Sequence, residues 1–475
     1  EISDSDWSSD VCSSDLRVVR ADLPAATRES TPAAPALPRP SIPTHVHPIA
    51  SELRIIPRAD HCISRKQISP NALRVLYKLH EAGFGAYLVG GAVRDLLIGG
   101  APKDFDVATN ATPEQVRGLF RNCRLIGRRF RLAHVVYGPE IIEVATFRAS
   151  ADDGSGDREV DNGVLVRDNV YGSIEDDAVR RDFTANALYY AIEDFSVRDF
   201  VGGYEDVRAR RLRLIGDPEA RYQEDPVRML RAVRLAAKLG FEIAPEAAEP
   251  IPRMAALLAD ASSARLFDES IKMLMSGHGL ESLLGLERTG LLPTLFPDTA
   301  AALAADGSGQ CRALMLEGLR NTDARVREDK PVTPAFLFAA LLWPAYAQEL
   351  ARLLDEGHEL AVAEQRAADR VTLRQTERIA IPRRFSVPMH EIWFLQSRFP
   401  LRQRKRVFRL RQHPRFKAAY DFLELRAAAV PELAAERDWW KDTLELDDAG
   451  LAARLDQQAT QGPRPRRRRR GARRG

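Results

Sequence analysis

The order of apolar and polar positions divides the chain into a mixed first half and a helical second half. Leu73, Leu76 and Leu79 recur at helical spacing after a Ser-Pro start, which predicts a helix that begins at Ser69. The stretches AYLVGG, KDFDVAT and IIEVATF read as strands, with AVRDLLIG as a short helix between the first two. Beyond about residue 217 the apolar spacing is helical. We therefore predict an α/β head with a mixed sheet and helices, followed by an all-α C-terminal body.

Composition narrows the classes of function. The formal net charge is only +3, but residues 462–475 carry eight arginines and no acid, which is typical of a nucleic-acid-binding tail. The longest strongly apolar run, Ala335–Trp343, has nine residues and falls far short of the ~20 needed to span a bilayer. The four cysteines are scattered without C-x-x-C spacing, which argues against a disulfide framework or a zinc site. We expect a cytoplasmic protein without a membrane span.

Candidate chemistry begins with two aspartates in KDFDVAT. Side chains alternate along a strand, so Asp104 and Asp106 project from one side while Phe105 and Val107 face the core. Two close carboxylates repel each other, and a bound Mg²⁺ relieves that repulsion. A third acid, Glu143, lies in the strand IIEVATF. The alternatives are a solvated strand edge for the aspartates, and for Glu143 an ion pair with an arginine of GRRFRLAH.

A glycine pair precedes these aspartates at a predicted strand-to-helix turn. Gly90 and Gly91 let the backbone come close to phosphates, the helix start adds N–H groups, and Arg94 adds a cation. Asp182 in VRRDFTANAL can orient a ribose or metal ligands, or it can cap a helix FTANALYYA. Turn geometry and surface ion pairs explain each feature singly, but the combination indicates a nucleoside triphosphate site.

A further predicted helix, DPVRMLRAVRLAAKLG, carries arginines at three-residue intervals. Arg228, Arg231 and Arg234 follow Asp225, which stands at the start of the helix. A carboxylate beside a guanidinium matches the amino group and ring nitrogen of adenine. An N-cap with helix-surface ion pairs explains the same residues. Both interpretations remain open on this stretch alone.

Five motifs taken in order resemble the class II template-independent nucleotidyltransferases, which include CCA-adding enzymes and bacterial poly(A) polymerases. They are LVGGAVRD, KDFDVAT, RRDFTANAL, DFVGGYEDV and EDPVRMLRAVR. Three more stretches, CRLIGRRFRLAHVVYGPEIIEVATFR, VTPAFLFAALLW and HPRFKAAYDFLELRA, are similar to the bacterial poly(A) polymerases, and the similarity runs from about residue 57 to 428. The resemblance implies addition of AMP from ATP to RNA 3′ ends, without a template and with release of pyrophosphate.

The resemblance also implies roles for individual residues. Asp104, Asp106 and Glu143 match the acids that hold Mg²⁺ in a two-metal site, and Asp182 matches a fourth catalytic acid. Ala185 departs from the Ile or Val common at its position, and we expect no effect on chemistry. The residues that match nucleotide-binding positions are Gly90, Gly91, Arg94, Arg181, Asp225, Arg228, Arg231 and Arg234.

Basic residues in the second half indicate contact with RNA, expected to be the 3′ ends of mRNA fragments and small RNAs. The stretch 398–417 mixes basic residues with Phe399, Phe408 and Phe416, and such surfaces bind phosphates and stack on bases. The alternative is an amphipathic helix, suggested by Val407 and Leu410, in which the aromatics belong to the core. The predicted RNA-binding residues are Arg404, Lys405, Arg409, Arg466, Arg467 and Arg468.

Composition and resemblance together predict five segments. Residues 1–56 are a non-native start and a disordered lead, because the first sixteen resemble translated sequencing-adapter sequence and the rest lack hydrophobic periodicity. The remaining segments are a nucleotidyltransferase head (57–216), a helical neck that reads nucleotide and RNA (217–290), a helical body with an RNA-binding region (291–445) and a disordered arginine-rich tail (446–475).

Two other functions share part of this pattern. A CCA-adding tRNA nucleotidyltransferase has the same head motifs but stops after three nucleotides on tRNA. A non-catalytic RNA-binding adaptor could keep the fold, but clustered acids that face a polyanion serve no purpose in RNA binding alone. The intact pair Asp104 and Asp106 therefore favours an enzyme.

Overall fold

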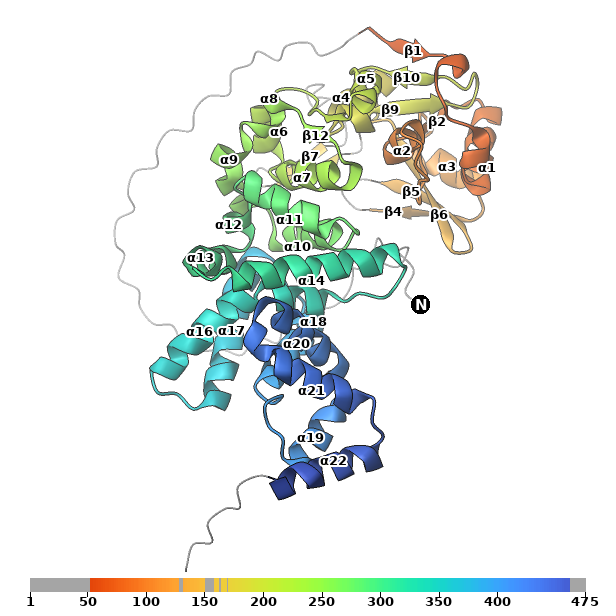
Figure 1. Cartoon of the computed structure of the whole chain (residues 1–475). Coiled ribbons are helices and arrows are strands. Elements are labelled where there is room, and N and C mark those ends of the chain that lie inside the picture. Colours follow the sequence, from red (N-terminus) through yellow and green to blue (C-terminus); the bar gives the residue numbers. More distant parts are fainter. Residues whose placement is uncertain (1–51, 128–130, 150–157, 162–163, 169, 462–475) are drawn as a thin grey trace, which may run out of the picture. The chain divides into compact units, whose positions relative to one another are not determined.

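The computed structural model describes residues 52–127, 131–149, 158–161, 164–168 and 170–461 (Figure 1). The chain divides into two compact units, with the boundary between Pro218 and Glu219. None of the helices in this described part of the chain is long and apolar enough to cross a membrane.

The first unit is built on a mixed eight-stranded sheet, as the sequence predicts. Its strand order is β1-β10-β9-β2-β3-β6-β5-β4. All neighbouring strands pair antiparallel except β3 and β6, which run parallel. The strands are β1 (Arg54–Ile56), β2 (Ala86–Val89), β3 (Asp106–Thr109), β4 (Cys123–Ile126), β5 (Leu132–Tyr137), β6 (Glu140–Thr146), β9 (Leu188–Ala191) and β10 (Val197–Asp199).

Short helices and turns connect these strands. The α-helices of this unit are α1 (Pro70–Glu81), α2 (Gly91–Leu97), α3 (Pro113–Leu119), α4 (Ile174–Arg180) and α5 (Gly203–Arg208). Three 3₁₀ turns, η2 (Arg58–Asp60), η3 (Arg65–Gln67) and η4 (Thr184–Asn186), and three further strands, β7 (Arg158–Asp161), β8 (Val164–Asp168) and β11 (Arg211–Leu212), complete the unit. Ser69 caps α1 by accepting the backbone N–H groups of Asn71 and Ala72, as its position predicts.

Two sequence predictions in this unit are wrong. The lead predicted to be disordered over 1–56 contains strand β1 at its end, because Ile56 is buried and the strand pairs with β10. The helix FTANALYYA does not form: η4 is followed by β9, whose four residues are buried between β2 and β10. Sheet pairing on both sides satisfies the backbone of this segment and outweighs its helical spacing.

The second unit is helical, as predicted, apart from one two-residue strand. Its elements from Pro218 to Ala305 are α6 (Pro218–Glu224), α7 (Val227–Leu239), β12 (Glu242–Ile243), α8 (Pro245–Ala248), α9 (Ile251–Met254), η5 (Ala255–Asp260), α10 (Ser263–Leu274), α11 (Gly279–Arg288), α12 (Leu292–Leu295) and α13 (Pro297–Ala305). From Gln310 on they are α14 (Gln310–Arg327), α15 (Pro334–Leu341), α16 (Trp343–Asp355), α17 (Leu360–Arg378), α18 (Arg383–Gln396), α19 (Arg404–Arg411), α20 (Phe416–Ala429), η6 (Pro431–Leu433), α21 (Ala434–Leu444) and α22 (Asp448–Gln461).

The predicted tail begins too early. Residues 446–475 are predicted to be disordered, yet α22 occupies much of that range (Figure 1). Leu451 and Leu455 lie one helical turn apart on α22, and both are buried in a core cluster with Trp440. Burial of this apolar stripe stabilises the helix, and the arginine run starts only after it.

The same core cluster decides between the two interpretations of the stretch 398–417. Phe399 and Phe416 are buried beside Trp440, and Phe408 packs against the cluster from its edge. Val407 and Leu410 form the buried side of α19, as the amphipathic alternative predicts. Phe399 and Phe416 are therefore part of the core, as the alternative interpretation predicts, and do not offer their rings to bases, whereas Phe408 is only half-buried.

One glycine is required where α5 meets the turn η4. A Cβ atom on Gly203 would lie 2.1 Å from the carbonyl oxygen of Thr184, closer than any real contact. Gly203→Ala should therefore push α5 away from η4 and lower the free energy of unfolding by about 2–4 kcal/mol, as measured by urea titration. Gly118→Ala in α3 is the matched control, because nothing lies within 4 Å of its Cβ position. Equal stability of the two variants would contradict the close approach.

Candidate active site

The parallel pair β3 and β6 brings the acids of the head together. Val107 pairs with Val144 in register, so Asp106 and Glu143 occupy the preceding neighbouring positions. Burial alternates as predicted: Phe105 and Val107 are buried, while Asp104 and Asp106 are exposed. Asp104 precedes the strand, which begins at Asp106. The acids therefore gather at the N-terminal end of β3.

Asp106 is electrostatically the most perturbed of these acids. The surrounding protein limits its hydration, and this desolvation together with the charge of Glu143 raises the pKa of Asp106 to about 6. The charge of Asp104 adds to the rise, whereas Arg181 and His134 oppose it. Although the side chain still reaches solvent, the neighbouring carboxylates give its surroundings a negative charge that Arg181 and His134 offset only in part. Such a cluster has the chemistry to bind a cation.

Among the residues that the structure describes, a histidine lies beside Glu143. Oε2 of Glu143 lies 3.4 Å from Nε2 of His134, which stands opposite it across the β5–β6 pair. Of the arginines in GRRFRLAH, Arg131 instead pairs with Glu114, and residues 128–130 lie outside the described part of the chain. His134 therefore lies where it can support an acid of the site.

The glycine turn lies beside the acids. Gly90 has φ 75° and ψ −137°, a conformation that residues with a side chain rarely adopt. A Cβ atom there would lie 3.6 Å from Nη1 of Arg181 and 4.0 Å from Oδ2 of Asp106. The structure thus brings the turn, the RRD arginine and one of the acids to the same place. Gly91 follows as the first residue of α2.

Arg94 and Asp182 are joined through Asn186. Arg94 is almost fully buried, and its Nη1 donates to Oδ1 of Asn186 at 2.5 Å while Nε and Nη2 donate to Asp95. Asn186 in turn donates to Oδ1 of Asp182 at 3.2 Å. Asp182 also accepts the backbone N–H of Phe183, so it shapes the turn η4 and caps no helix. Arg94 therefore links α2 to the RRDFT segment.

The carboxylates fit a divalent cation that shares its ligands with a substrate. Within the described residues, no three His, Cys, Asp or Glu side chains lie close enough together to hold a metal ion by themselves. Mg²⁺ typically takes one or two protein carboxylates and completes its octahedron with phosphate oxygens and water. The hard oxygen donors of Asp104, Asp106 and Glu143, and the repulsion between them, suit that kind of site.

Asp225 and Arg228 lie in the second unit and have separate partners. The N-cap residue of α7 is Pro226, whereas the sequence predicts Asp225 at that position. Asp225 nevertheless accepts the backbone N–H of Val227 at 3.2 Å, and its Oδ2 lies 2.8 Å from Nη2 of Arg265. Arg228 donates from Nη1 to Glu224 at 2.7 Å. The sequence predicts that Asp225 and Arg228 present an acceptor and a donor side by side to one base. In the structure each of them is bound to another residue instead.

Arg231 and Arg234 share one buried acid. Glu269 on α10 lies 3.9 Å from Nη1 of Arg231 and 3.1 Å from Nε of Arg234. Arg265, the partner of Asp225, lies one turn before Glu269 on the same helix. Helix α10 therefore holds Asp225, Arg231 and Arg234, whereas Arg228 is held by Glu224 of α6. No pattern in the sequence of α10 indicates this role.

The predicted RNA-binding residues fall into two groups. Arg404 on α19 pairs with Asp456 on α22 at 3.1 Å, and both side chains are more than half exposed. Lys405 and Arg409 lie on the exposed or half-exposed part of α19. Arg466, Arg467 and Arg468 lie outside the described residues.

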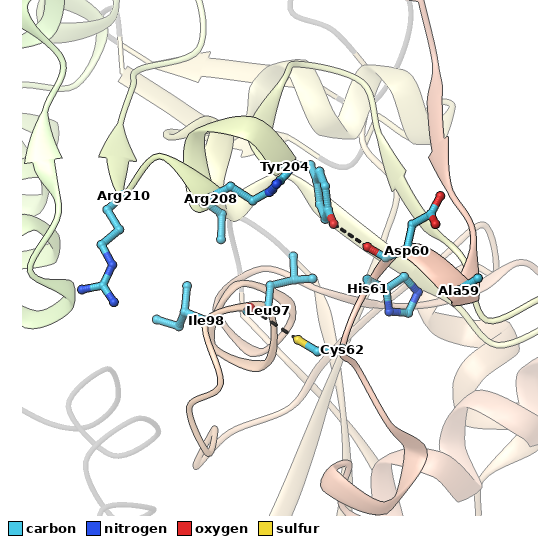
Figure 2. Close-up of a pocket in the computed structure, with 10 residues that line it drawn as sticks. Ala59, Asp60, His61, Cys62, Leu97, Ile98, Tyr204, Arg208 and Arg210 are labelled. Atoms are coloured by element: carbon cyan, nitrogen blue, oxygen red, sulfur yellow. Dashed lines mark hydrogen bonds between the residues drawn. The ribbon is translucent and has the colours of Figure 1, made fainter.

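The first unit contains a cavity of about 570 Å³, whose lining residues are shown in Figure 2. It lies beside the C-terminal end of α2, whereas the glycine turn precedes the N-terminal end of that helix. Its lining includes Cys62 and Tyr204, which donate hydrogen bonds to backbone carbonyls. The described residues that line it include none of the predicted site residues, so the chemistry places the site at the acids.

Sequence reasoning missed the residues that hold the site in place. Asp206, buried beneath η4, accepts Oγ1–H of Thr184 at 2.7 Å and binds Arg213. Asp177 and Tyr189 both bind Arg181. An acid four residues before Arg181 on one helix was a detectable signal for Asp177, whereas Asp206 and Tyr189 meet the site only through the fold.

Three family models match the chain in order. The poly A polymerase head domain matches residues 86–213, and the probable RNA and SrmB-binding site of polymerase A matches residues 240–303. The arginine-rich C-terminus of polymerase A matches residues 356–474. The acids, the glycine turn and the RRD segment all lie within the head-domain match.

Whole-chain comparisons separate close relatives from distant ones. Poly(A) polymerase I of Salmonella typhi is 49% identical over 453 residues, which cover 93% of this chain and 94% of that protein. The CCA-adding enzyme of Bacillus pumilus is 36% identical over 233 residues, only 46% of this chain and 56% of that protein.

A solved structure shares the fold. The Bacillus stearothermophilus CCA-adding enzyme in complex with CTP has a TM-score of 0.55 and 28% identity, and the match covers 79% of this chain and 82% of that one. The relative that matches both units at high identity is a poly(A) polymerase I. The chain therefore belongs to the bacterial poly(A) polymerase I family, the polynucleotide adenylyltransferases of the class II nucleotidyltransferase superfamily.

Proposed function

We propose that this chain adds AMP units from ATP to the 3′ ends of RNA, releasing pyrophosphate and using no template. The observation that carries this proposal is the convergence of Asp106, Glu143, the Gly90 turn and Arg181 at the end of β3. The negative cluster suits a metal-bound triphosphate, and the adjacent guanidinium suits its phosphates.

In this mechanism Asp104, Asp106 and Glu143 would hold Mg²⁺, and Asp182 would assist them as the fourth acid. When bound, the metal lowers the pKa of the primer 3′-hydroxyl and neutralises charge at the triphosphate. The Gly90–Gly91 turn admits the phosphates to the backbone, and Arg181 offsets their charge. Arg94 donates to Asn186, which donates to Asp182, so Arg94 helps to fix the position of Asp182. The protein mainly positions groups and balances charge.

We assign the choice of adenine to Asp225, Arg228, Arg231 and Arg234, because a carboxylate and guanidinium groups complement the edge of that base. Their ion pairs with Arg265, Glu224 and Glu269 hold each side chain in a defined position. A preformed arrangement lowers the entropy cost of binding one base and disfavours the others.

The substrates suggest the remaining partners and the compartment. RNA 3′ ends, including those of mRNA fragments and small RNAs, would be the primers, with basic residues of α19 and of the arginine run as phosphate contacts. Because ATP and RNA are cytoplasmic in bacteria, we place the reaction in the cytoplasm.

Nucleotide choice provides the test of the proposed function. With a single-stranded oligonucleotide that is not a tRNA, ATP should give long A tracts and stoichiometric pyrophosphate, while CTP, GTP and UTP give little. If the chain acted instead as a CCA-adding enzyme, like its more distant relatives, a tRNA primer would receive three nucleotides and extension would then stop. That outcome would overturn the assignment.

Substitution of an acid of the site should abolish activity, whereas substitution of an acid outside the site should not. Asp106→Asn should reduce AMP incorporation by at least about 10³-fold, because the neutral amide cannot replace the carboxylate as a metal ligand. RNA binding, measured by filter retention, should stay within about twofold. Asp60→Asn, in an exposed position that lines the separate cavity, is the control and should keep full activity. Activity in a purified Asp106→Asn sample would exclude Asp106 as a ligand.

The raised pKa of Asp106 predicts a pH dependence of stability. Its folded pKa, about 6, lies above its ordinary value of 3.8, so the charged carboxylate destabilises the fold at higher pH. Asp106→Asn should therefore be more stable than the parent at pH 8, by at most ~1 kcal/mol because solvent screens the charge. The difference should shrink as pH falls through 6 and vanish near 4. Urea titrations in EDTA measure it, and a constant difference would contradict the cause.

The arginine run predicts a salt dependence of RNA binding. Deletion of residues 462–475 should weaken binding and flatten the plot of log affinity against log salt, by roughly 0.7 units of slope for each lost phosphate contact. A chain in which the eight arginines of this segment are replaced by lysine should keep the slope, since charge alone determines it. Identical slopes for the deletion and the parent would remove the segment from the RNA interface.

A further inference from the structure

Hydrogen bonds join the side chains of Arg181, Asp177 and Tyr189 to one another. Nε and Nη2 of Arg181 donate to Oδ2 of Asp177 at 3.2 and 3.0 Å, and Nε also donates to the hydroxyl of Tyr189 at 3.0 Å. The Tyr189 hydroxyl donates to the same Oδ2 at 2.7 Å. Asp177 lies on α4 and Tyr189 on β9, so two separate elements fix one guanidinium.

The two sides of this guanidinium face different surroundings. Nε and Nη2 lie against Asp177 and Tyr189, whereas Nη1 lies at the glycine turn, 3.6 Å from where a Cβ of Gly90 would stand. Asp106 lies at that same turn. Because the guanidinium is planar and rigid, fixing one edge also fixes the direction of the other.

The ring of Tyr189 is fixed by its packing in the core of the sheet. It is fully buried and contacts the rings of Tyr87, Phe147 and Phe200 edge to face, with centroids 6.0 to 6.4 Å apart. Burial also raises the pKa of Tyr189 far above the physiological range, so its hydroxyl keeps the proton that it donates to Asp177. The position of that hydroxyl is therefore determined by the packing of the sheet.

We propose that Asp177 and Tyr189 are positioning residues that aim Arg181 at the triphosphate of the incoming ATP. This inference rests on the proposed function and extends it to two residues outside the nucleotide-contacting set. A guanidinium held in one direction loses little side-chain entropy when the phosphates bind, whereas a mobile one loses more. Asp177 also compensates the charge of Arg181 while no nucleotide is bound.

The strand provides a matched control at the next position. Tyr190 follows Tyr189 on β9, so its side chain points to the other face of the sheet, where its ring lies edge to face with His61. It is also buried, so Tyr190→Phe removes a hydroxyl from a second buried tyrosine of the same strand without touching Arg181. Any general effect of deleting a buried hydroxyl should appear in both variants.

The experiment compares Tyr189→Phe with Tyr190→Phe in the full chain. Tyr189→Phe should raise KM for ATP about 5-fold to 20-fold, the effect expected of losing a hydrogen bond that orders a charged group, with KM for RNA unchanged. Binding of inorganic tripolyphosphate, followed by calorimetry, should weaken by a similar factor, and binding of adenosine should not change. Tyr190→Phe should leave all four quantities as in the parent.

Two outcomes overturn the inference. One is an equal KM for ATP in the two tyrosine variants. The other is found in an Arg181→Lys background, where Tyr189→Phe should have little further effect, because interacting residues are not additive. A full additional rise there would show that Tyr189 acts independently of Arg181. Failure of the proposed function is distinct, since a parent that incorporates no AMP still reports tripolyphosphate affinity in the calorimeter.

Discussion

The parallel pairing of β3 with β6 is the constraint on which the head depends. In a sheet that is otherwise antiparallel, this one pairing places Asp106 beside Glu143 and leaves Asp104 just ahead of the strand. Desolvation of Asp106, together with repulsion from Glu143 and Asp104, raises the pKa of Asp106 and disfavours its charged form. The guanidinium of Arg181 opposes this rise, and a divalent cation bound as we propose would relieve the repulsion further.

The rest of the head restrains the groups around that cluster. Buried Asp206 anchors Thr184, and Gly203 allows α5 to approach the same turn closely. Arg94 reaches the RRDFT segment through Asn186. These contacts are short and buried, where hydrogen bonds to charged groups are strong and costly to leave unmade. A site that binds ATP beside these acids, as we propose, would gain from such rigid support.

In the helical unit, ion pairs also hold side chains in place, and there they hold the residues that we propose choose the base. Helix α10 supplies both Arg265 and Glu269, which order the acid and the arginines of α7. Farther along the chain, Leu395, Trp440 and Leu451 join α18, α21 and α22 in one core, so the basic residues of α19 project from a packed scaffold. Aromatic residues that resemble an RNA-stacking surface in the sequence therefore serve the core instead.

The sequence by itself determined the mixed head, the helical body, the glycine turn and the candidate acids, because strand alternation, helix caps and motif spacing are local properties. It did not determine the conformation of FTANALYYA or the partner of Glu143. Nor did it identify the roles of Tyr189, Asp206 and Glu269. Those depended on which strands pair and which helices pack together, and such contacts join residues far apart in the chain. Only the tertiary structure decided them, since burial and pairing outweigh local preference wherever the two conflict.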